Sequence, residues 1–566
     1  MRIRALSLAL AACLWMRAAA GATELAGTWL GPPPNAYFFP PGTKISGYPN
    51  VNAFTERVVF VHKNGVLSGT LLSMDGSSPL RDLKVQRDTI SFSVSKPQYT
   101  EAFHGRIRTD ELQLTLVIRD AGQTFSMPAT YRRASAEDLG IVAKGPVYSF
   151  ARLPLPPLRD VPGDHLAPTP PMGTGILVVS SDAEVRKVAD EMVANGMRDA
   201  GYVYIQIDEG WQGRRDAQGN IRANENFPDM KALADYVHAK GLKLGVYSSP
   251  GPAACYGYAG SYGHEAQDAR SYAQWGIDYL KYDWCSAGEI YHTRAELQAA
   301  YQKMGEALRA THRPIIYALC EYGLFDVWSW GRKVGANLWR TSGDIDIGNR
   351  WESIVSNGFE HNGKLSHAGA DGWNDPDDLL IGKSGMTIDE DRTQMTLWAI
   401  MAAPLFVGLA NNHMDAWTPA VKSILMNREV IAVDQDVSGI QGHLVLHRGP
   451  IEVWTKRLSD GTTAVGVFNL GSKARQVQVH WQELGLGKVR DARDLWRKAD
   501  LGSLPGGYEG VLPAHGAALL KVAAHARRST SSTSRFVSSA SDWGGYRLPS
   551  YRLGAFIPAQ SGTCFG

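Results

Sequence analysis

The sequence predicts an α/β protein: a (β/α)8 TIM barrel flanked by an N-terminal all-β domain and a C-terminal antiparallel β-sandwich. Three observations predict this fold class. Between residues 172 and 430, short apolar stretches alternate with amphipathic ones at the spacing of strand–helix units. On both sides of this part, residues alternate with period two between turn signals, as in antiparallel sheets. The chain of 566 residues is also longer than a domain with a single hydrophobic core, so several domains are expected.

The overall composition is that of a folded protein with a near-balanced charge. Apolar residues make up 44% and charged residues 20% of the chain, which excludes a disordered protein. The formal net charge of +2 provides no basic surface, so we expect no nucleic-acid partner. After the N-terminal stretch, no segment offers the roughly 18 uninterrupted apolar residues that a membrane span requires. The oligomeric state is not indicated.

The first 22 residues have the features of a secretory signal peptide. Arg2 and Arg4 precede an apolar run, and small residues follow at 18–22. We therefore expect removal of residues 1–22 and a secreted or periplasmic protein. A lipoprotein anchor at Cys13 is the alternative.

The next part, residues 23–150, is predicted to form the all-β domain. Alternating stretches occur at 56–65, 66–76, 88–95 and 111–122, and Asn64-Gly65 and Asp75-Gly76 are hairpin turn signals. Residues 151–171 are rich in proline, which indicates a linker.

Residues 172–430 are predicted to form the barrel. We expect its strands at 174–180, 202–208, 242–248, 278–283, 314–321, 336–342, 365–370 and 397–408. Amphipathic helices are expected at 182–196, 227–241 and 294–310. Strand patterns return over 431–523, which we assign to the β-sandwich. Residues 524–566 are rich in Ser, Thr and Arg and are predicted to be a low-complexity tail.

Charged residues stand at the C-terminal ends of these strands, where TIM-barrel enzymes have their active sites. A single acid there would be explained by helix capping, but several converging on one mouth are not. The candidates, in chain order, are Asp208, Glu209, Tyr247, Lys281, Asp283, Glu321, Arg340, Asp344 and Asp377.

Two chemistries use a ring of carboxylates: binding of a hard metal cation, and glycoside hydrolysis by a carboxylate pair. Lys281 and Arg340 would repel a metal, and the sequence has no HxH or HExxH motif. Tyr247, Trp284 and Trp373 offer flat faces for a sugar ring. Glycoside hydrolysis is therefore favoured, with no metal and no cofactor.

Seven motifs between residues 165 and 522 resemble glycoside hydrolase family 27, the α-galactosidases or melibiases. They are PPMG (170–173), IDEGW (207–211), ALADYVHAKGLKLGVYSSPG (232–251), GSYGHEAQDARSYAQWGIDYLKYDWC (260–285), CE (320–321), WRTSGDI (339–345) and GWNDPD (372–377). The resemblance implies a retaining glycosidase with a (β/α)8 barrel and a C-terminal β domain. It does not cover the N-terminal β domain or the tail.

The resemblance also implies roles for individual residues. Asp283 matches the nucleophile and Asp344 the general acid/base. The positions that match substrate-binding residues are Asp208, Glu209, Tyr247, Lys281, Glu321, Arg340 and Asp377. Cys255 and Cys285 match a disulfide, and we expect Cys320 to remain a buried thiol.

The implied substrate carries a terminal α-D-galactosyl unit, in a galactose- or arabinopyranose-containing oligosaccharide or polysaccharide. Glu321 and Leu324 replace the small residues of relatives that accept N-acetylgalactosamine, so an acetamido group at C2 should be excluded.

Several departures from the family pattern keep alternatives open. Glu209 replaces an aspartate and lengthens the side chain into the space of the sugar C6 group, so a β-L-arabinopyranosidase is the alternative function. No tryptophan follows PPMG, which leaves a degenerate sugar-binding barrel as a further alternative. Residues 408–412 and Asp378 also differ from the family pattern.

Overall fold

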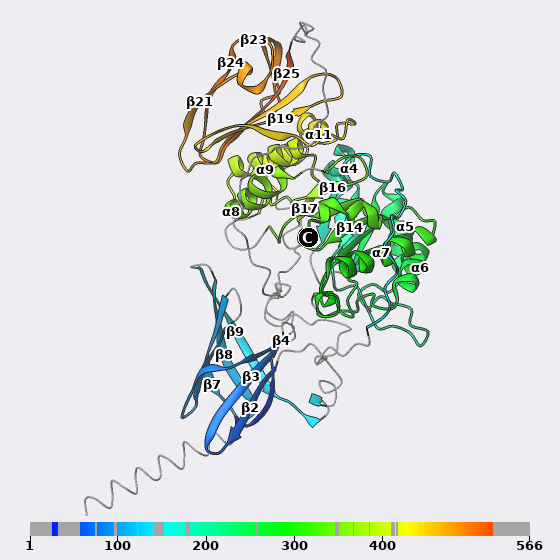
Figure 1. Cartoon of the computed structure of the whole chain (residues 1–566), viewed down its shortest axis with the longest axis vertical. Coiled ribbons are helices and arrows are strands. Elements are labelled where there is room, and N and C mark those ends of the chain that lie inside the picture. The colour runs from blue at the N-terminus through cyan, green and yellow to red at the C-terminus, as the bar shows by residue number, and fades with distance from the viewer. Residues whose placement is uncertain are drawn as a thin grey trace, which may run out of the picture.

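The computed structural model describes residues 25–31, 57–73, 76–95, 99–120, 123–136, 138–139, 152–176, 181–255, 257–345, 350–365, 367–383, 385–408, 414 and 417–524 (Figure 1). The predicted signal peptide, Cys13, the stretch 177–180 after PPMG, residues 409–412 and the tail beyond residue 524 lie outside the described residues. No helix in the described ranges is long and apolar enough to cross a membrane.

The N-terminal part forms one nine-stranded antiparallel sheet, drawn in blue in Figure 1. Its strands are β1 (Gly27–Leu30), β2 (Arg57–Lys63), β3 (Val66–Ser73), β4 (Gly76–Pro79), β5 (Arg81–Gln86), β6 (Thr89–Ser95), β7 (Tyr99–Ile107), β8 (Glu111–Asp120) and β9 (Gln123–Arg133). They follow the order β4-β3-β2-β1-β9-β8-β7-β6-β5. Alternate residues such as Phe60, Phe92 and Phe103 fill the core, with the rings of Phe92 and Phe103 stacked at 4.8 Å. The period-two pattern of the sequence is explained by this one buried face.

Eight parallel strands form the central sheet. They are β10 (Met172–Ile176), β11 (Tyr204–Ile207), β12 (Lys243–Ser248), β13 (Tyr279–Asp283), β14 (Ile316–Cys320), β15 (Leu338–Arg340), β16 (Trp373–Asp375) and β17 (Leu405–Gly408). Neighbouring strands pair in the order β16-β15-β14-β13-β12-β11-β10-β17. A parallel bridge between Leu379, just past β16, and Val407 joins the two edges. The sheet therefore closes as the predicted (β/α)8 barrel.

Helices surround the strands, as Figure 1 shows for α5, α6 and α7. The helices are α3 (Asp182–Ala194), α4 (Met197–Ala200), α5 (Met230–Ala239), α6 (Glu265–Trp275), α7 (Arg294–Ala310), α8 (Arg350–Ile354), α9 (Ile388–Met401), α10 (Pro419–Leu425) and α11 (Arg428–Asp434). Thr293 with Glu296, and Thr387 with Glu390, form capping boxes that satisfy the first N–H groups of α7 and α9.

Two predicted strands need correction. Residues 365–370 form no strand; the seventh strand is β16, directly on the WND sequence. The stretch 397–408 does not form one strand, because α9 continues to Met401 and only Leu405–Gly408 is β17. Nearly every residue of α9 is buried, because the helix lies between the barrel and the C-terminal sheet. It therefore lacks the amphipathic pattern that marks a surface helix.

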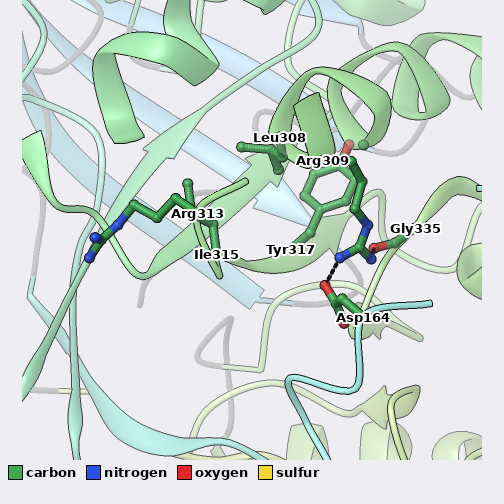
Figure 2. A pocket seen from close by; sticks show the side chains of 8 residues that line it. Asp164, Leu308, Arg309, Arg313, Ile315, Tyr317 and Gly335 are labelled. Carbon is green, nitrogen blue, oxygen red and sulfur yellow. Dashed lines mark hydrogen bonds and ion pairs between the residues drawn. The ribbon is translucent and has the colours of Figure 1, made fainter. Parts of the chain in front are cut away.

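The proline-rich segment 152–171, predicted as a linker, lies along the barrel. Its backbone is hydrogen-bonded to Gln302 of α7 at Arg159 and Pro157, and Asp164 forms an ion pair with Arg309 at the end of the same helix. Figure 2 shows this ion pair beside a cavity of about 10 Å³, space for about one water molecule. Ala167 then packs beneath the barrel core, so the segment covers the base of the barrel, opposite the mouth.

The C-terminal part is antiparallel throughout. A six-stranded sheet has the order β18-β19-β20-β25-β22-β23, and β21 pairs with β24. The strands are β18 (His443–Arg448), β19 (Ile451–Arg457), β20 (Thr463–Asn469), β21 (Arg475–His480), β22 (Val489–Asp494), β23 (Ala499–Leu504), β24 (Gly507–Leu512) and β25 (Ala517–Ala524). The buried Lys456 side chain donates hydrogen bonds to the carbonyls of Ala399, Val433 and Asp434, which ties this sheet to α9 and α11. α11 spans the boundary expected at residues 430 and 431.

Candidate active site

Alternation along the parallel strands decides which side chains point into the barrel. On β13, Lys281 and Asp283 share the inner face, which explains the two charges two residues apart at the end of an otherwise apolar strand. The strand register places Asp283 beside Cys320 of β14, and Arg340 of β15 beside Asp375 of β16. All these positions are at or near the C-terminal strand ends, so the charged side chains meet at one mouth of the barrel.

Asp283 is completely buried and held by three hydrogen bonds. Its Oδ2 atom accepts from the Tyr247 hydroxyl at 2.8 Å, and its Oδ1 atom accepts from the Trp284 backbone N–H and the Tyr322 hydroxyl, both at 2.7 Å. The sequence analysis missed Tyr322. No residue pattern pointed to it, because its contact with Asp283 depends on a left-handed backbone conformation at Tyr322.

Lys281 lies next to Asp208 and forms an ion pair with it. The Lys281 ammonium donates to Asp208 Oδ2 at 3.0 Å, and both side chains are largely buried. Burial raises the pKa of the Asp208 carboxyl above its ordinary value, and the charge of Lys281 opposes that shift. The adjacent Glu209 is also buried, and its Oε1 atom accepts from the backbone N–H of Tyr258 at 3.1 Å.

Arg340 bridges two further carboxylates. The Arg340 Nη2 atom lies 3.0 Å from Asp344 Oδ1 and 2.9 Å from Asp377 Oδ2, and the Ile345 N–H also donates to Asp377. Asp377 has a φ of +83°, an unfavourable left-handed conformation for a non-glycine residue, which the surrounding contacts hold in place. The guanidinium therefore fixes both carboxylates at the mouth.

The second oxygen of Asp344 has no hydrogen-bond partner among the described residues, although it is buried. Burial, followed by the negative charges of Asp377 and Asp283, raises the pKa of Asp344 to about 7, while Arg340 and Lys281 oppose the rise. A carboxyl group with this pKa can hold a proton near neutral pH and release it, as a general acid/base must.

Two further buried carboxyls complete the mouth. Glu321 accepts one hydrogen bond from the Gly323 N–H, whereas its Oε2 atom has no partner in the described ranges. Burial raises the pKa of Glu321 well above its ordinary value. Asp378 has the same two properties, and it lies with Lys383 near Gly408 at the end of β17. Unsatisfied buried carboxyl oxygens at a barrel mouth are suited to bind the hydroxyl groups of a ligand.

The expectation that Trp284 and Trp373 face a sugar is wrong. Trp284 follows the inward-pointing Asp283, so it points outward and stacks on Tyr301 of α7 with ring centroids 5.4 Å apart. Trp373 points inward but lies deeper in the barrel, and its indole N–H donates to the Ala167 carbonyl at the base. Of the three aromatic residues, only Tyr247 lies at the mouth.

The cysteines connect the loops around Asp283. Cys255 and Cys285 form a disulfide with their Cα atoms 4.9 Å apart, which joins the loop after β12 to the end of β13. Cys320 is buried as a thiol, and its sulfur accepts a 3.8 Å contact from Arg340. The disulfide therefore restrains the chain on both sides of the Tyr247–Asp283 hydrogen bond.

Comparisons with known proteins agree with this geometry. The family model described as alpha galactosidase A matches residues 178–436, and the model for the alpha galactosidase C-terminal beta sandwich domain matches residues 448–522. The alpha-galactosidase of Cyamopsis tetragonoloba is 41% identical over 62% of this chain and 85% of its own length. Alpha-galactosidase A of Cellvibrio japonicus is 38% identical over 63% of this chain and 93% of its own length.

Solved structures give the same result. Alpha-galactosidase I from Mortierella vinacea has a TM-score of 0.59 and 32% identity, covering 63% of this chain and 97% of its own. A β-L-arabinopyranosidase from Geobacillus stearothermophilus has a TM-score of 0.56 and 26% identity, over 63% of this chain and 97% of its own. The chain thus belongs to the alpha-galactosidase (melibiase) family, glycoside hydrolase family 27.

Proposed function

We propose that the protein is a retaining exo-glycosidase that hydrolyses terminal α-D-galactosyl residues, with Asp283 as nucleophile and Asp344 as general acid/base. One observation carries this proposal beyond family membership. Asp283 is held by three hydrogen-bond donors as an oriented carboxylate, while Asp344 at the same mouth has a pKa raised to about 7. Two carboxyls with divided roles are what double displacement requires.

In the first step of this mechanism, an oxygen of Asp283 attacks the anomeric carbon of the galactosyl unit. The bond from that carbon to the leaving oxygen breaks, and Asp344 gives its proton to the leaving oxygen. In the second step, Asp344 takes a proton from water, the water oxygen attacks the anomeric carbon, and the bond to Asp283 breaks. The anomeric configuration is inverted twice and hence retained.

Substrate binding is assigned to the side chains around this pair. Lys281 and Asp208 present a donor and an acceptor in one ion pair, which suits the neighbouring hydroxyls of a sugar ring. Arg340 and Glu321 lie on the other side of Asp283, across β14 and β15, and would bind further hydroxyls. Because Glu321 is buried and bulky, it would leave no room for an acetamido substituent at C2.

Glu209 favours a second candidate, β-L-arabinopyranosidase activity. Its carboxylate is held on the Tyr258 backbone N–H, so the extra methylene relative to aspartate occupies a fixed position in the binding region. L-arabinopyranose has the ring configuration of galactose without the C6 group and would fit such a narrowed pocket. The enzyme is proposed to act on galactose- or arabinopyranose-containing oligosaccharides or polysaccharides outside the cytoplasm, with residues 1–22 as its export signal.

A side-by-side assay tests this assignment. We expect the purified enzyme to turn over an aryl α-D-galactoside. In the Glu209→Asp variant, the shorter side chain frees the space of the C6 group. The kcat/KM for the α-galactoside, divided by that for the β-L-arabinopyranoside, should therefore rise by about 10-fold or more. A preference of the unmodified enzyme for the arabinopyranoside would select the second candidate. Binding of galactose without turnover of either glycoside would reject hydrolysis and leave a sugar-binding barrel.

A further inference from the structure

The loop that follows β14 contains an unusual run of left-handed residues. Tyr322 has a φ of +59°, and Gly323, Phe325 and Asp326 also have positive φ values of 84°, 54° and 56°. Glycine adopts this conformation readily, but bulky aromatic residues do not. Residues persist in such conformations only where the surrounding structure imposes them, and they are concentrated at functional sites. The strained conformation of Tyr322 therefore suggests that this residue has a functional role.

The strained backbone brings the Tyr322 phenol onto the nucleophile. Its hydroxyl donates to Asp283 Oδ1 at 2.7 Å, and the guanidinium carbon of Arg340 lies 6.0 Å from the centre of its ring. Gly323 approaches the Thr341 carbonyl so closely that a Cβ atom would lie 2.2 Å from that oxygen. The turn is thus tightly packed between β14 and β15, which restrains the backbone that carries the phenol.

The hydrogen bonds of Asp283 distinguish its two oxygens. A carboxylate offers about four acceptor sites, two on each oxygen. Both sites of Oδ1 are used, by the Trp284 N–H and the Tyr322 hydroxyl, whereas Oδ2 accepts only the Tyr247 hydroxyl among the described donors. The Cys255 sulfur lies 3.7 Å from Oδ2, but in the disulfide it carries no proton to donate. One acceptor site therefore remains, and it is on Oδ2.

We propose that Tyr322 is a positioning residue for the nucleophile: with the Trp284 N–H it holds Oδ1 of Asp283 out of the reaction and directs Oδ2 to the anomeric carbon. This inference rests on the proposed function. In the covalent intermediate, Oδ2 carries the galactosyl unit and Oδ1 is the ester carbonyl oxygen, still hydrogen-bonded to Tyr322.

The two steps make opposite use of this hydrogen bond. When Oδ2 attacks, negative charge leaves the carboxylate and the hydrogen bond to Oδ1 weakens. When water displaces the carboxylate, the electron pair of the C1–Oδ2 bond returns to Asp283, and the hydrogen bond strengthens as the charge builds up. The Tyr322 proton stays on its oxygen throughout. Tyr322 should therefore accelerate the second step more than the first.

The test is Tyr322→Phe, which removes the hydroxyl and keeps the ring. For an activated aryl α-galactoside, whose turnover is limited by the second step, we expect kcat to fall by about 10- to 100-fold, the loss for one hydrogen bond to a charged group. KM should fall with it, so that kcat/KM changes little. Intact-mass measurement after the substrate is removed should show that the galactosyl adduct decays about 10- to 100-fold more slowly on the variant than on the unmodified enzyme.

Two further variants make the result specific. Tyr322→Asn removes the phenol with a residue that tolerates the left-handed conformation, and it should show the same joint fall of kcat and KM with little change in kcat/KM. Tyr236→Phe is the matched control, because Tyr236 of α5 donates to Asp190 on the helical surface, and it should leave both constants unchanged.

Equal losses of kcat and kcat/KM in both Tyr322 variants, or no change in either constant, would overturn the inference while the activity of the unmodified enzyme stands. Absence of turnover by the unmodified enzyme would instead reject the proposed function.

Discussion

Asp283→Ala is expected to lower kcat on an aryl α-galactoside by about 10⁴-fold or more, the scale on which removal of a catalytic nucleophile acts. The substitution removes the buried carboxylate at the mouth that three donors hold, from Tyr247, Trp284 and Tyr322. No neighbouring carboxylate takes its place, because Asp208 is paired with Lys281 and Asp344 with Arg340. The measurement is steady-state kinetics on the purified variant.

The same variant leaves a cavity that a small anion can enter. Azide should restore part of the turnover by attacking the anomeric carbon from the side that Asp283 occupied, and the product should be the β-galactosyl azide. Asp216→Ala, at a surface turn closed by Asn220 and Arg222, is the control for the loss of a carboxylate and should retain activity. Full activity of Asp283→Ala without azide would reject its role as nucleophile.

Asp344→Asn is expected to have an effect that depends on the leaving group. An amide cannot give up a proton, so substrates with alkyl or sugar leaving groups should lose about 10²- to 10⁴-fold in kcat/KM. Activated aryl galactosides, whose leaving groups need no proton, should lose far less in kcat/KM. Equal losses for both substrate classes would contradict the role of Asp344 as the acid.

The pH profile provides a second measure of the same residue. The acid must be protonated in the free enzyme, and the pKa of Asp344 is raised to about 7 by burial and by Asp377 and Asp283. The kcat/KM for a substrate with a poor leaving group should therefore fall as the pH rises through about 7. The Asp344→Asn variant should lack this alkaline limb.

The sequence was sufficient to predict the barrel and the residues around its mouth. At the end of β13, Lys281 and Asp283 stand two residues apart, and this spacing puts both side chains on one face of the strand. Closure of the barrel then brings residues from six strands to the same mouth, and contacts such as Lys281–Asp208 and Arg340–Asp344 follow from it.

Orientation and local backbone conformation could not be predicted in the same way. Trp373 was misassigned because the seventh strand was placed at 365–370 instead of 373–375. Trp284 directly follows the inward-pointing Asp283, and this alternation turns it to the outside of the barrel. Tyr322 was missed because its contact with Asp283 depends on a left-handed φ, which no residue pattern indicated. α9 was misread because a helix buried on all sides has no polar face.

Asp283 is expected to become covalently bonded to the sugar during turnover. The most direct test is to incubate the enzyme with an activated 2-deoxy-2-fluoro galactosyl donor, digest the protein and locate the labelled residue by peptide mass spectrometry. We predict a stoichiometric label on the peptide that contains Asp283, at that side chain. A label on a different carboxylate, or continued turnover of the donor with no covalent adduct, would reject Asp283 as the nucleophile.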